Sequence, residues 1–193
     1  MKQLSIIGST ASGKSDLALA LAQEHNALIL SIDSLSIYKE IDIASAKPSC
    51  DELSLIPHFG INRLSPNETA SVITFIDEYR ALSEQAQKEK KNIIIVGGSS
   101  FYLKSMLEGL SPIPTYSPDT IEKTKSMLEN LEETYRLLSA VDPTAMEKIT
   151  PNDRYRIEKL LLIYLETAIA PSQWFKSHPP QPIITECPVV EIK

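Results

Sequence analysis

The chain has 193 residues, of which 42% are hydrophobic and 23% are charged, and its formal net charge at pH 7 is −6. This length suits one domain with a sizeable core and a small inserted subdomain. The acidic balance argues against a surface that coats nucleic acid, although a local basic patch is compatible with it. No apolar run has membrane-spanning length, and Cys50 and Cys187 lack metal-type spacing. We therefore expect a cytoplasmic protein with free thiols, no signal peptide and no membrane contact.

The first predicted elements are a strand at 3–7 and a helix at 14–24, joined by the motif G-x-x-x-x-G-K-S. This strand–loop–helix context separates a phosphate-binding loop from a chance match. The glycines let backbone N–H groups approach an anion, the lysine reaches phosphate oxygens, and the serine hydroxyl suits Mg²⁺. The predicted phosphate-binding residues are Gly8, Ser9, Thr10, Ala11, Ser12, Gly13, Lys14 and Ser15. The loop recognises only oxygens, so a nucleoside triphosphate is the default ligand but not the required one.

The middle of the chain alternates between strands and helices. A strand is predicted at 28–32, an irregular stretch follows, and an amphipathic helix is predicted at 69–90. The run "NIIIVGG" has the composition of a fully buried strand, and "SFYLKSMLEGL" after it predicts a short helix. This alternation predicts an α/β fold of the P-loop NTPase type, with a parallel sheet and helices on both of its faces.

The pattern changes after residue 110. The stretch "SPIPTYSP" is followed by helical patterns at 119–129, 131–140, 143–149 and 152–168 with no strand between them. We therefore expect a P-loop core at 1–110, an all-helical insertion at 111–182, and a strand that returns to the core at 183–193. An α/β unit that stops on a strand looks incomplete.

Polar groups follow three predicted strands and should meet at one edge of the sheet, because ligands lie outside the carboxyl ends of parallel strands. These groups are the phosphate loop, Asp33 after the second strand, and Ser99 after Gly97 and Gly98. Asp33 has two open readings, as the cap of a turn at 34–37 or as a site carboxylate that could act as a general base. The glycine pair could simply end its strand. We take His58 as a packed loop histidine rather than a catalyst.

An ordinary NTPase carries an acidic residue at the end of a buried strand to hold the Mg²⁺ water shell, and "NIIIVGGSS" has none. Five stretches instead resemble the bacterial tRNA isopentenyltransferase (dimethylallyltransferase) family, in order and along almost the whole chain. They are "GSTASGKS", "SIDSLSIYKEIDIASAKPS", "PHFGIN", "VGGSSFYLKSMLEGLSPIP" and "VDPTAMEKITPNDRYRIEKLLLIYLETA". The resemblance implies that the loop holds the pyrophosphate of dimethylallyl diphosphate rather than ATP. The five-carbon group would move to N6 of an adenosine beside the anticodon of tRNA.

The resemblance also implies roles for individual residues. Asp33 would be the general base on the adenine amine, and Ser15 would bind Mg²⁺ and the pyrophosphate, so these two form the catalytic pair. Thr10 would line the donor site. The partner would be the anticodon stem-loop of tRNA, bound by a monomer. The residues that the resemblance implies for tRNA contact are Asp33, Ser34, Leu35, Ser36, Ser99, Tyr155, Arg156, Ile157, Glu158 and Lys159.

Four departures from the family pattern stand out. Ser15 and Ser99 each replace a usual threonine and keep its hydroxyl, and "ASAKP" makes the turn at Ala44 less free than the common "GTAKP". The chain also lacks the C-terminal third of the family, which supplies a basic region that grips tRNA. The predicted insertion has eight Lys or Arg against ten Asp or Glu and is no substitute for it.

Two other functions stay open. A small-molecule P-loop kinase would share the loop and the acidic residue after the second strand. It would need an arginine-rich lid, however, and the insertion offers only Arg136, Arg154 and Arg156. The other possibility is an inactive, truncated remnant of the transferase that still binds tRNA or diphosphate.

Overall fold

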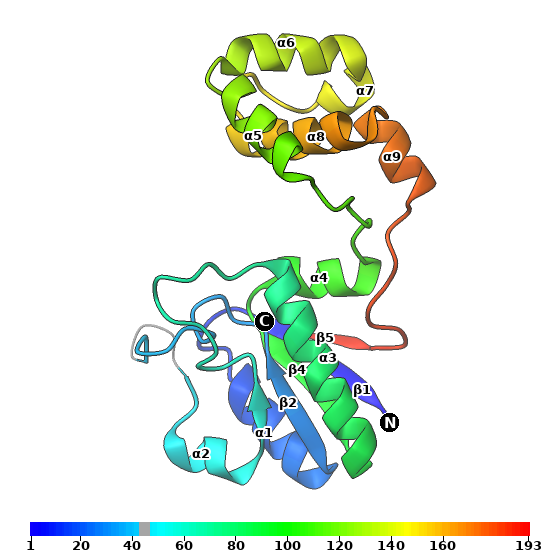
Figure 1. The fold of residues 1–193 in the computed structure, drawn as a ribbon. Coiled ribbons are helices and arrows are strands. Elements are labelled where there is room, and N and C mark those ends of the chain that lie inside the picture. Colours follow the sequence, from blue (N-terminus) through cyan, green and yellow to red (C-terminus); the bar gives the residue numbers. More distant parts are fainter. Residues whose placement is uncertain (43–46) are drawn as a thin grey trace. The chain divides into compact units, whose positions relative to one another are not determined.

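The computed structural model describes residues 1–42 and 47–193, so the expectation about Ala44 lies outside the described residues. The chain forms two compact units (Figure 1). Residues 1–109 and 182–193 make up the first unit, which contains the sheet, and residues 110–181 make up the second unit, which is helical. Each unit has a hydrophobic core of its own.

The first unit is built on a five-stranded sheet in the order β3-β2-β4-β1-β5, and every neighbouring pair is parallel. The central strands β2 and β4 are buried nearly throughout, as expected for strands covered on both faces. The α/β fold with a parallel sheet is therefore confirmed. The strands are β1 (Gln3–Gly8), β2 (Ala27–Ser31), β3 (His58–Phe59), β4 (Asn92–Gly97) and β5 (Val189–Ile192).

Helices cover both faces of this sheet. On one face α1 (Lys14–Glu24) buries Ala18 against Ile29 of β2 and neighbouring strand residues. On the other face α3 (Val72–Glu89) and α4 (Ser100–Glu108) pack Phe75 and Leu103 against Leu30 and its neighbours. Successive side chains of β2 alternate between these two cores, because side chains of a strand point to opposite faces in turn.

Two short elements of the first unit were not expected. The helix α2 (Cys50–Leu55) begins with a capping box, in which Ser49 and Glu52 bond to each other's backbone N–H. The strand β3 has only two residues, which pair with β2 through Ile29 and Leu30. Neither element is long enough to show a helix or strand period in the sequence. The helix α3 starts at Val72 rather than residue 69, because Ser71 caps it.

The second unit holds five helices in its described residues. Its core contains Leu128, Leu138, Met146, Ile157 and Leu161. The two segments that enter and leave the unit are tied together by an antiparallel bridge between Leu110 and Gln181. The helices are α5 (Pro118–Met127), α6 (Leu131–Val141), α7 (Pro143–Met146), α8 (Arg154–Thr167) and α9 (Pro171–Ser177), and the sequence patterns did not indicate α9.

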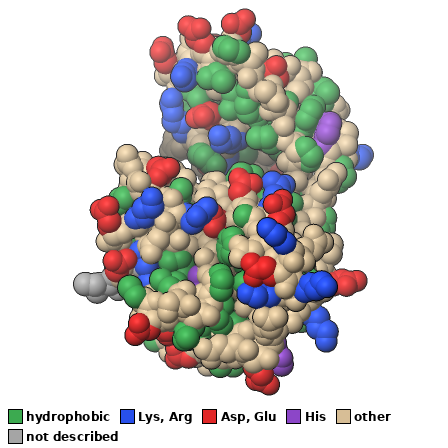
Figure 2. Space-filling model, turned by 60° about the horizontal axis from the view of Figure 1, so that its bottom comes forward, with side chains coloured by type: hydrophobic (Ala, Val, Ile, Leu, Met, Phe, Trp, Pro, Cys, Tyr) green, Lys and Arg blue, Asp and Glu red, His purple; other side chains and the backbone are tan. Residues whose placement is uncertain are grey.

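Charges of both signs are mixed on the surface. Figure 2 shows acidic and basic side chains interspersed over the visible face. This mixture reflects the composition, in which 19 Lys and Arg accompany 25 Asp and Glu.

Candidate functional site

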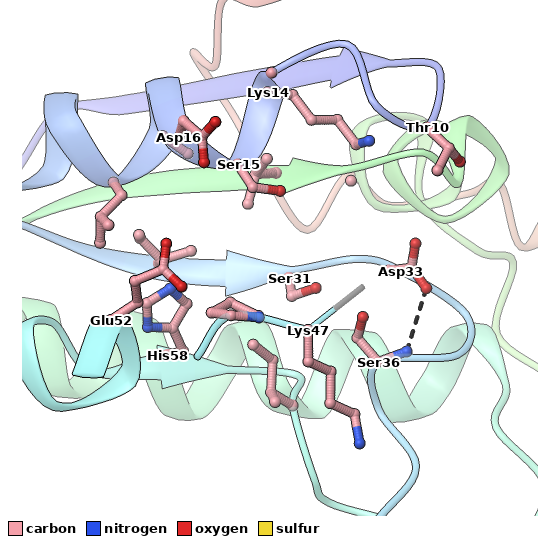
Figure 3. Close-up of a pocket in the computed structure, with 18 of the residues that line it drawn as sticks. Thr10, Lys14, Ser15, Asp16, Ser31, Asp33, Ser36, Lys47, Glu52 and His58 are labelled. Carbon is pink, nitrogen blue, oxygen red and sulfur yellow. Dashed lines mark hydrogen bonds between the residues drawn. The ribbon is translucent and has the colours of Figure 1, made fainter. Parts of the chain in front are cut away.

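A cavity of about 300 Å³ lies in the first unit, on the face of the sheet that α1 covers. It reaches from the phosphate loop and the carboxyl ends of β2 and β4 back along α1 towards α2 and β3 (Figure 3). The chain segments that line it are far apart in sequence, because parallel strands bring their carboxyl ends to one edge. The cavity brings together Thr10, Lys14 and Ser15 of the loop, Asp33 and Ser36 after β2, and Lys47 and His58.

The phosphate loop has the backbone that an anion site needs. Gly13 has φ of +78° and a Cβ there would meet nothing within 4 Å, while Ala11 has φ of +63°. Left-handed backbone at these points turns N–H groups inward, and α1 begins directly at Lys14 with its positive dipole end. The Nζ of Lys14 donates a hydrogen bond to the Ser9 carbonyl at 3.0 Å, so this cation folds over its own loop. The loop is therefore shaped for phosphate oxygens, with a cation beside them.

Other loop residues support the shape without lining the cavity. A Cβ at Gly8 would lie 2.5 Å from the Ile192 carbonyl oxygen of β5, so this position requires glycine. The Ser12 hydroxyl is buried and finds no hydrogen-bond partner among the described residues. Gly8, Ser9 and Ser12 therefore belong to the loop's frame, whereas Thr10, Ala11, Gly13, Lys14 and Ser15 face the cavity.

Asp33 caps a turn and also lines the cavity. Its Oδ1 accepts hydrogen bonds from the backbone N–H groups of Leu35 at 2.9 Å and Ser36 at 3.2 Å, which is the geometry of a turn cap. Figure 3 shows the same carboxylate at the cavity, facing the side where Lys14 and Thr10 lie. Its Oδ2 forms no hydrogen bond with a described residue. The cap fixes the carboxylate, and the second oxygen remains able to accept a proton.

Sequence reasoning gave no role to Lys47, which the structure places on the cavity wall. Its side chain is only 5% exposed, and its Nζ donates to the Tyr38 carbonyl at 2.6 Å, the Asp42 carboxylate at 2.8 Å and the Asn62 amide oxygen at 2.7 Å. These bonds tie the chain after Asp33 to the loop after β3. The signal was present in the sequence as the lysine of "AKP", but a loop lysine looks solvated until the tertiary structure buries it.

His58 also lines the cavity, at the end away from Asp33. Burial lowers its pKa, partly offset by the bond between its Nδ1 and the Ile56 carbonyl and by the charge of Glu52. The pKa of Glu52 is itself lowered by hydrogen bonds from Ser49. The Nδ1 of His58 lies 2.7 Å from that carbonyl oxygen. The structure places His58 half-buried in β3 rather than in a loop, and it forms part of the cavity wall.

The residues expected to contact tRNA fall in three places. Asp33 and Ser36 line the cavity, while Ser34 and Leu35 lie exposed beside it and Ser99 is the N-cap residue before α4. Tyr155, Arg156 and Lys159 are exposed on α8 of the second unit, where the Lys159 amine lies 5.4 Å from the Tyr155 ring centroid, and Glu158 is partly exposed.

Ile157 corrects this expectation, because it is completely buried in the core of the second unit. Its side chain cannot reach RNA. The helix period places it on the inner face of α8 together with Leu160 and Leu161.

Two features are absent from the described residues. Within 1–42 and 47–193, no three His, Cys, Asp or Glu side chains are grouped closely enough to hold a metal ion by themselves. Among the helices in that part of the chain, none has the length and apolar character needed to cross a membrane.

Comparisons with known proteins agree on one family. The model of the IPP transferase family matches residues 36–192. The tRNA dimethylallyltransferase of Sulfurovum sp. is 50% identical over 194 residues, covering 100% of this chain and 64% of that protein. The tRNA dimethylallyltransferase of Sulfurimonas denitrificans is 50% identical over 192 residues, covering 100% of this chain and 65% of that protein.

Solved structures give the same result. A eukaryotic dimethylallyltransferase acting on tRNA matches with a TM-score of 0.84 at 26% identity, covering 100% of this chain and 48% of that one. The tRNA isopentenylpyrophosphate transferase of Staphylococcus epidermidis matches with a TM-score of 0.53 at 30% identity, covering 92% of this chain and 59% of that one. The chain thus spans a little under two thirds of the length of the curated relatives it matches, 64% in the first case.

Proposed function

The chain belongs to the IPP transferase family, and from this premise we propose that it transfers a dimethylallyl group from dimethylallyl diphosphate to N6 of an adenosine beside the anticodon of tRNA. The relatives that cover the whole chain are named for dimethylallyl transfer to tRNA. We further propose that the protein works in the cytoplasm and as a monomer.

One observation carries the proposal: a phosphate loop and a fixed carboxylate line the same cavity. Lys14 and the loop N–H groups stabilise the diphosphate as it leaves with the electrons of the breaking C–O bond. The adenine N6 forms the new C–N bond and gives up a proton to Asp33. The exocyclic amine is a poor nucleophile, and removal of this proton by the carboxylate makes its attack possible. Lys14 and the loop, which would stabilise the leaving group, and Asp33, which would accept the proton, thus lie around the same cavity (Figure 3).

The cavity also suits Mg²⁺. Ser15 offers an exposed hydroxyl, and Asp16 and Asp33 line the cavity with carboxylates. These are hard oxygen donors of the kind that Mg²⁺ takes, and an ion that keeps several waters needs few protein ligands. Ser15 would hold the ion at the loop, with water molecules completing its coordination shell. When bound, Mg²⁺ neutralises part of the diphosphate charge.

The acceptor base would reach the cavity past the turn that Asp33 caps. An adenosine in a stem-loop must leave its stack before its N6 can approach a carboxylate in a cavity. Ser34, Leu35 and Ser36 form this turn next to Asp33 and are the residues placed to line the extruded nucleotide. The exposed Tyr155, Arg156 and Lys159 of α8 supply an aromatic ring and two cations for further contact with tRNA.

The experiment incubates the 193-residue chain with Mg²⁺, labelled dimethylallyl diphosphate and an anticodon stem-loop RNA. We expect label on the adenine N6, and we expect Lys14→Ala to lose pyrophosphate binding in calorimetry while it keeps the fold. Steady ATP hydrolysis, or thermal protection by ATP alone, would instead indicate the small-molecule kinase. Pyrophosphate binding without any transfer would indicate the truncated remnant.

A further inference from the structure

A buried serine lies in the floor of the cavity. Ser31 is the last residue of β2, pairs with Val96 of β4, and is only 8% exposed. Its hydroxyl forms no hydrogen bond with any residue of the described chain, and it faces the cavity (Figure 3). The other four residues of β2, Ala27–Leu30, are all apolar and buried.

The hydroxyl at this position is open to the cavity rather than sealed in the core, since the buried side-chain oxygens without a partner among the described residues are those of Ser12 and Thr124. A polar side chain that ends an otherwise apolar buried strand and meets only the cavity is available to a ligand. Ser5, a buried serine of β1 that pairs with Ile95 of β4, has a partner inside the protein, because its Oγ lies 3.0 Å from the Cys187 sulfur. Ser31 has no such partner in the described protein, and the space before it is the ligand cavity.

The surroundings indicate which part of a ligand meets this hydroxyl. In Figure 3 Ser31 on β2 lies below Ser15 on α1, and both hydroxyls point to the side where Lys14 and Asp33 lie. That side of the cavity has the loop, the start of α1 and the lysine, which together select an anion. A neutral O–H donor directed there suits a diphosphate oxygen and does nothing for a dimethyl tail.

We propose that Ser31 is a further donor-binding residue, whose hydroxyl donates a hydrogen bond to the diphosphate of the bound donor. This inference rests on the proposed function and deepens it, because it adds a contact from the sheet to those from the loop. The diphosphate is then held from two sides, by the phosphate loop above and by the end of β2 below. The same strand end continues to Asp33, so one segment positions the donor and the base.

The test compares Ser31→Ala with the parent by calorimetry, using inorganic pyrophosphate with Mg²⁺ and then dimethylallyl diphosphate. We expect both ligands to bind roughly 10- to 100-fold more weakly, the loss typical of a hydrogen bond to a charged group. The thermal midpoint without ligand should stay close to that of the parent, because the Ser31 hydroxyl forms no hydrogen bond within the described protein. A purely structural serine would show the opposite behaviour, with a lower midpoint and normal affinity.

Ser5→Ala is the matched control, since it also removes a hydroxyl from a buried strand position but lies outside the cavity. It should bind pyrophosphate like the parent. If Lys14→Ala loses binding while Ser31→Ala binds pyrophosphate like the parent, the loop assignment stands and the role of Ser31 is refuted. If Ser31→Ala binds pyrophosphate normally but transfers the prenyl group to RNA more slowly, the proposal is also refuted, because Ser31 would then contact the acceptor rather than the diphosphate. A parent chain that binds no diphosphate overturns both proposals.

Discussion

At the scale of single residues, the site depends on side chains that do structural and chemical work together. Asp33 uses one oxygen to hold the turn at Leu35 and Ser36, and it presents the other to the cavity. Lys47 uses all three of its N–H donors on the wall and has none left for a ligand. A carboxylate held by its own turn is pre-organised, so under the proposed function it would lose little freedom when the acceptor amine binds.

The dual geometry of Asp33 makes Asp33→Asn a clean test. Asparagine keeps the oxygen that caps the turn, so we expect an unchanged thermal midpoint and unchanged pyrophosphate affinity. The amide cannot accept the N6 proton, so prenyl transfer should fall by roughly 10² to 10⁴, measured with labelled donor and stem-loop RNA. Asp77→Asn, at an exposed ion pair with Arg80, is the control and should change nothing. Transfer at the parental rate in Asp33→Asn would remove Asp33 from the mechanism.

At the scale of elements, capping residues decide where helices begin and how they are joined. Asp142 caps α7 by accepting from the Ala145 N–H at 3.0 Å, and it also accepts from the backbone N–H of Ser172 at 2.6 Å and from its hydroxyl at 2.9 Å. This single carboxylate, 3% exposed, thereby ties α7 to α9. Burial alone would raise the pKa of Asp142, but the hydrogen bonds from Ser172, Ala145 and Thr144 outweigh it and lower that pKa.

The lowered pKa predicts a loss of stability in acid. A depressed pKa means that the stabilisation is fully present above the unfolded pKa of about 3.9 and is lost as pH falls through the folded value. Asp142→Asn should therefore cost about 2 kcal/mol at pH 7, because an amide group cannot accept every bond that the carboxylate accepts. Urea unfolding at pH 7 and pH 3 measures this, and the gap between parent and variant should shrink at pH 3. If the difference in unfolding free energy between parent and Asp142→Asn does not depend on pH, the role of the charge is contradicted. Asp119→Asn, on the first turn of α5, is the control.

At the scale of the whole molecule, the chain consists of two units with separate cores. The second unit leaves and rejoins the first through Leu110 and Gln181, which are partners in an antiparallel bridge. Just after this point the backbone N–H groups of Ile183 and Ile184 both donate to the Met106 carbonyl at the end of α4. The chain is thus brought back to the first unit by bonds that lie within that unit.

These joints predict that the first unit folds without the second. Replacing residues 110–181 by a short Gly/Ser linker should leave a folded protein, because paired bridge residues are only about 5 Å apart. Circular dichroism should show a cooperative transition, and calorimetry should show pyrophosphate affinity like that of the full chain, since every cavity residue lies in the first unit. Transfer to stem-loop RNA should be lost, because the variant lacks Tyr155, Arg156 and Lys159. Loss of pyrophosphate binding in the folded variant would show that the loop needs the second unit.

Local patterns were enough for much of this fold. The phosphate loop, the apolar runs of β2 and β4, and the amphipathic α3 carry their signals within a few residues, and the predicted parallel sheet is confirmed. The sequence patterns did not predict the two-residue β3 or the six-residue α2. The strand β3 is defined by its pairing with β2, and the helix α2 is defined by its cap. The burial of Ile157 could have been predicted, because Ile157, Leu160 and Leu161 have the spacing of the apolar face of a helix. This spacing was a better guide to Ile157 than its place in the motif.

The sequence by itself determined which chemistry is available: a phosphate loop, a carboxylate after the second strand, and no acid on the strand of Ile93 to Val96. Only the tertiary structure decided which polar groups share a cavity. It placed Ser31, Lys47 and His58 with the loop, and it left Ser99 outside the cavity lining. The reason is physical. Residue types and periods are local properties, whereas proximity depends on strand order, and the parallel register brings positions far apart in the chain to one edge of the sheet.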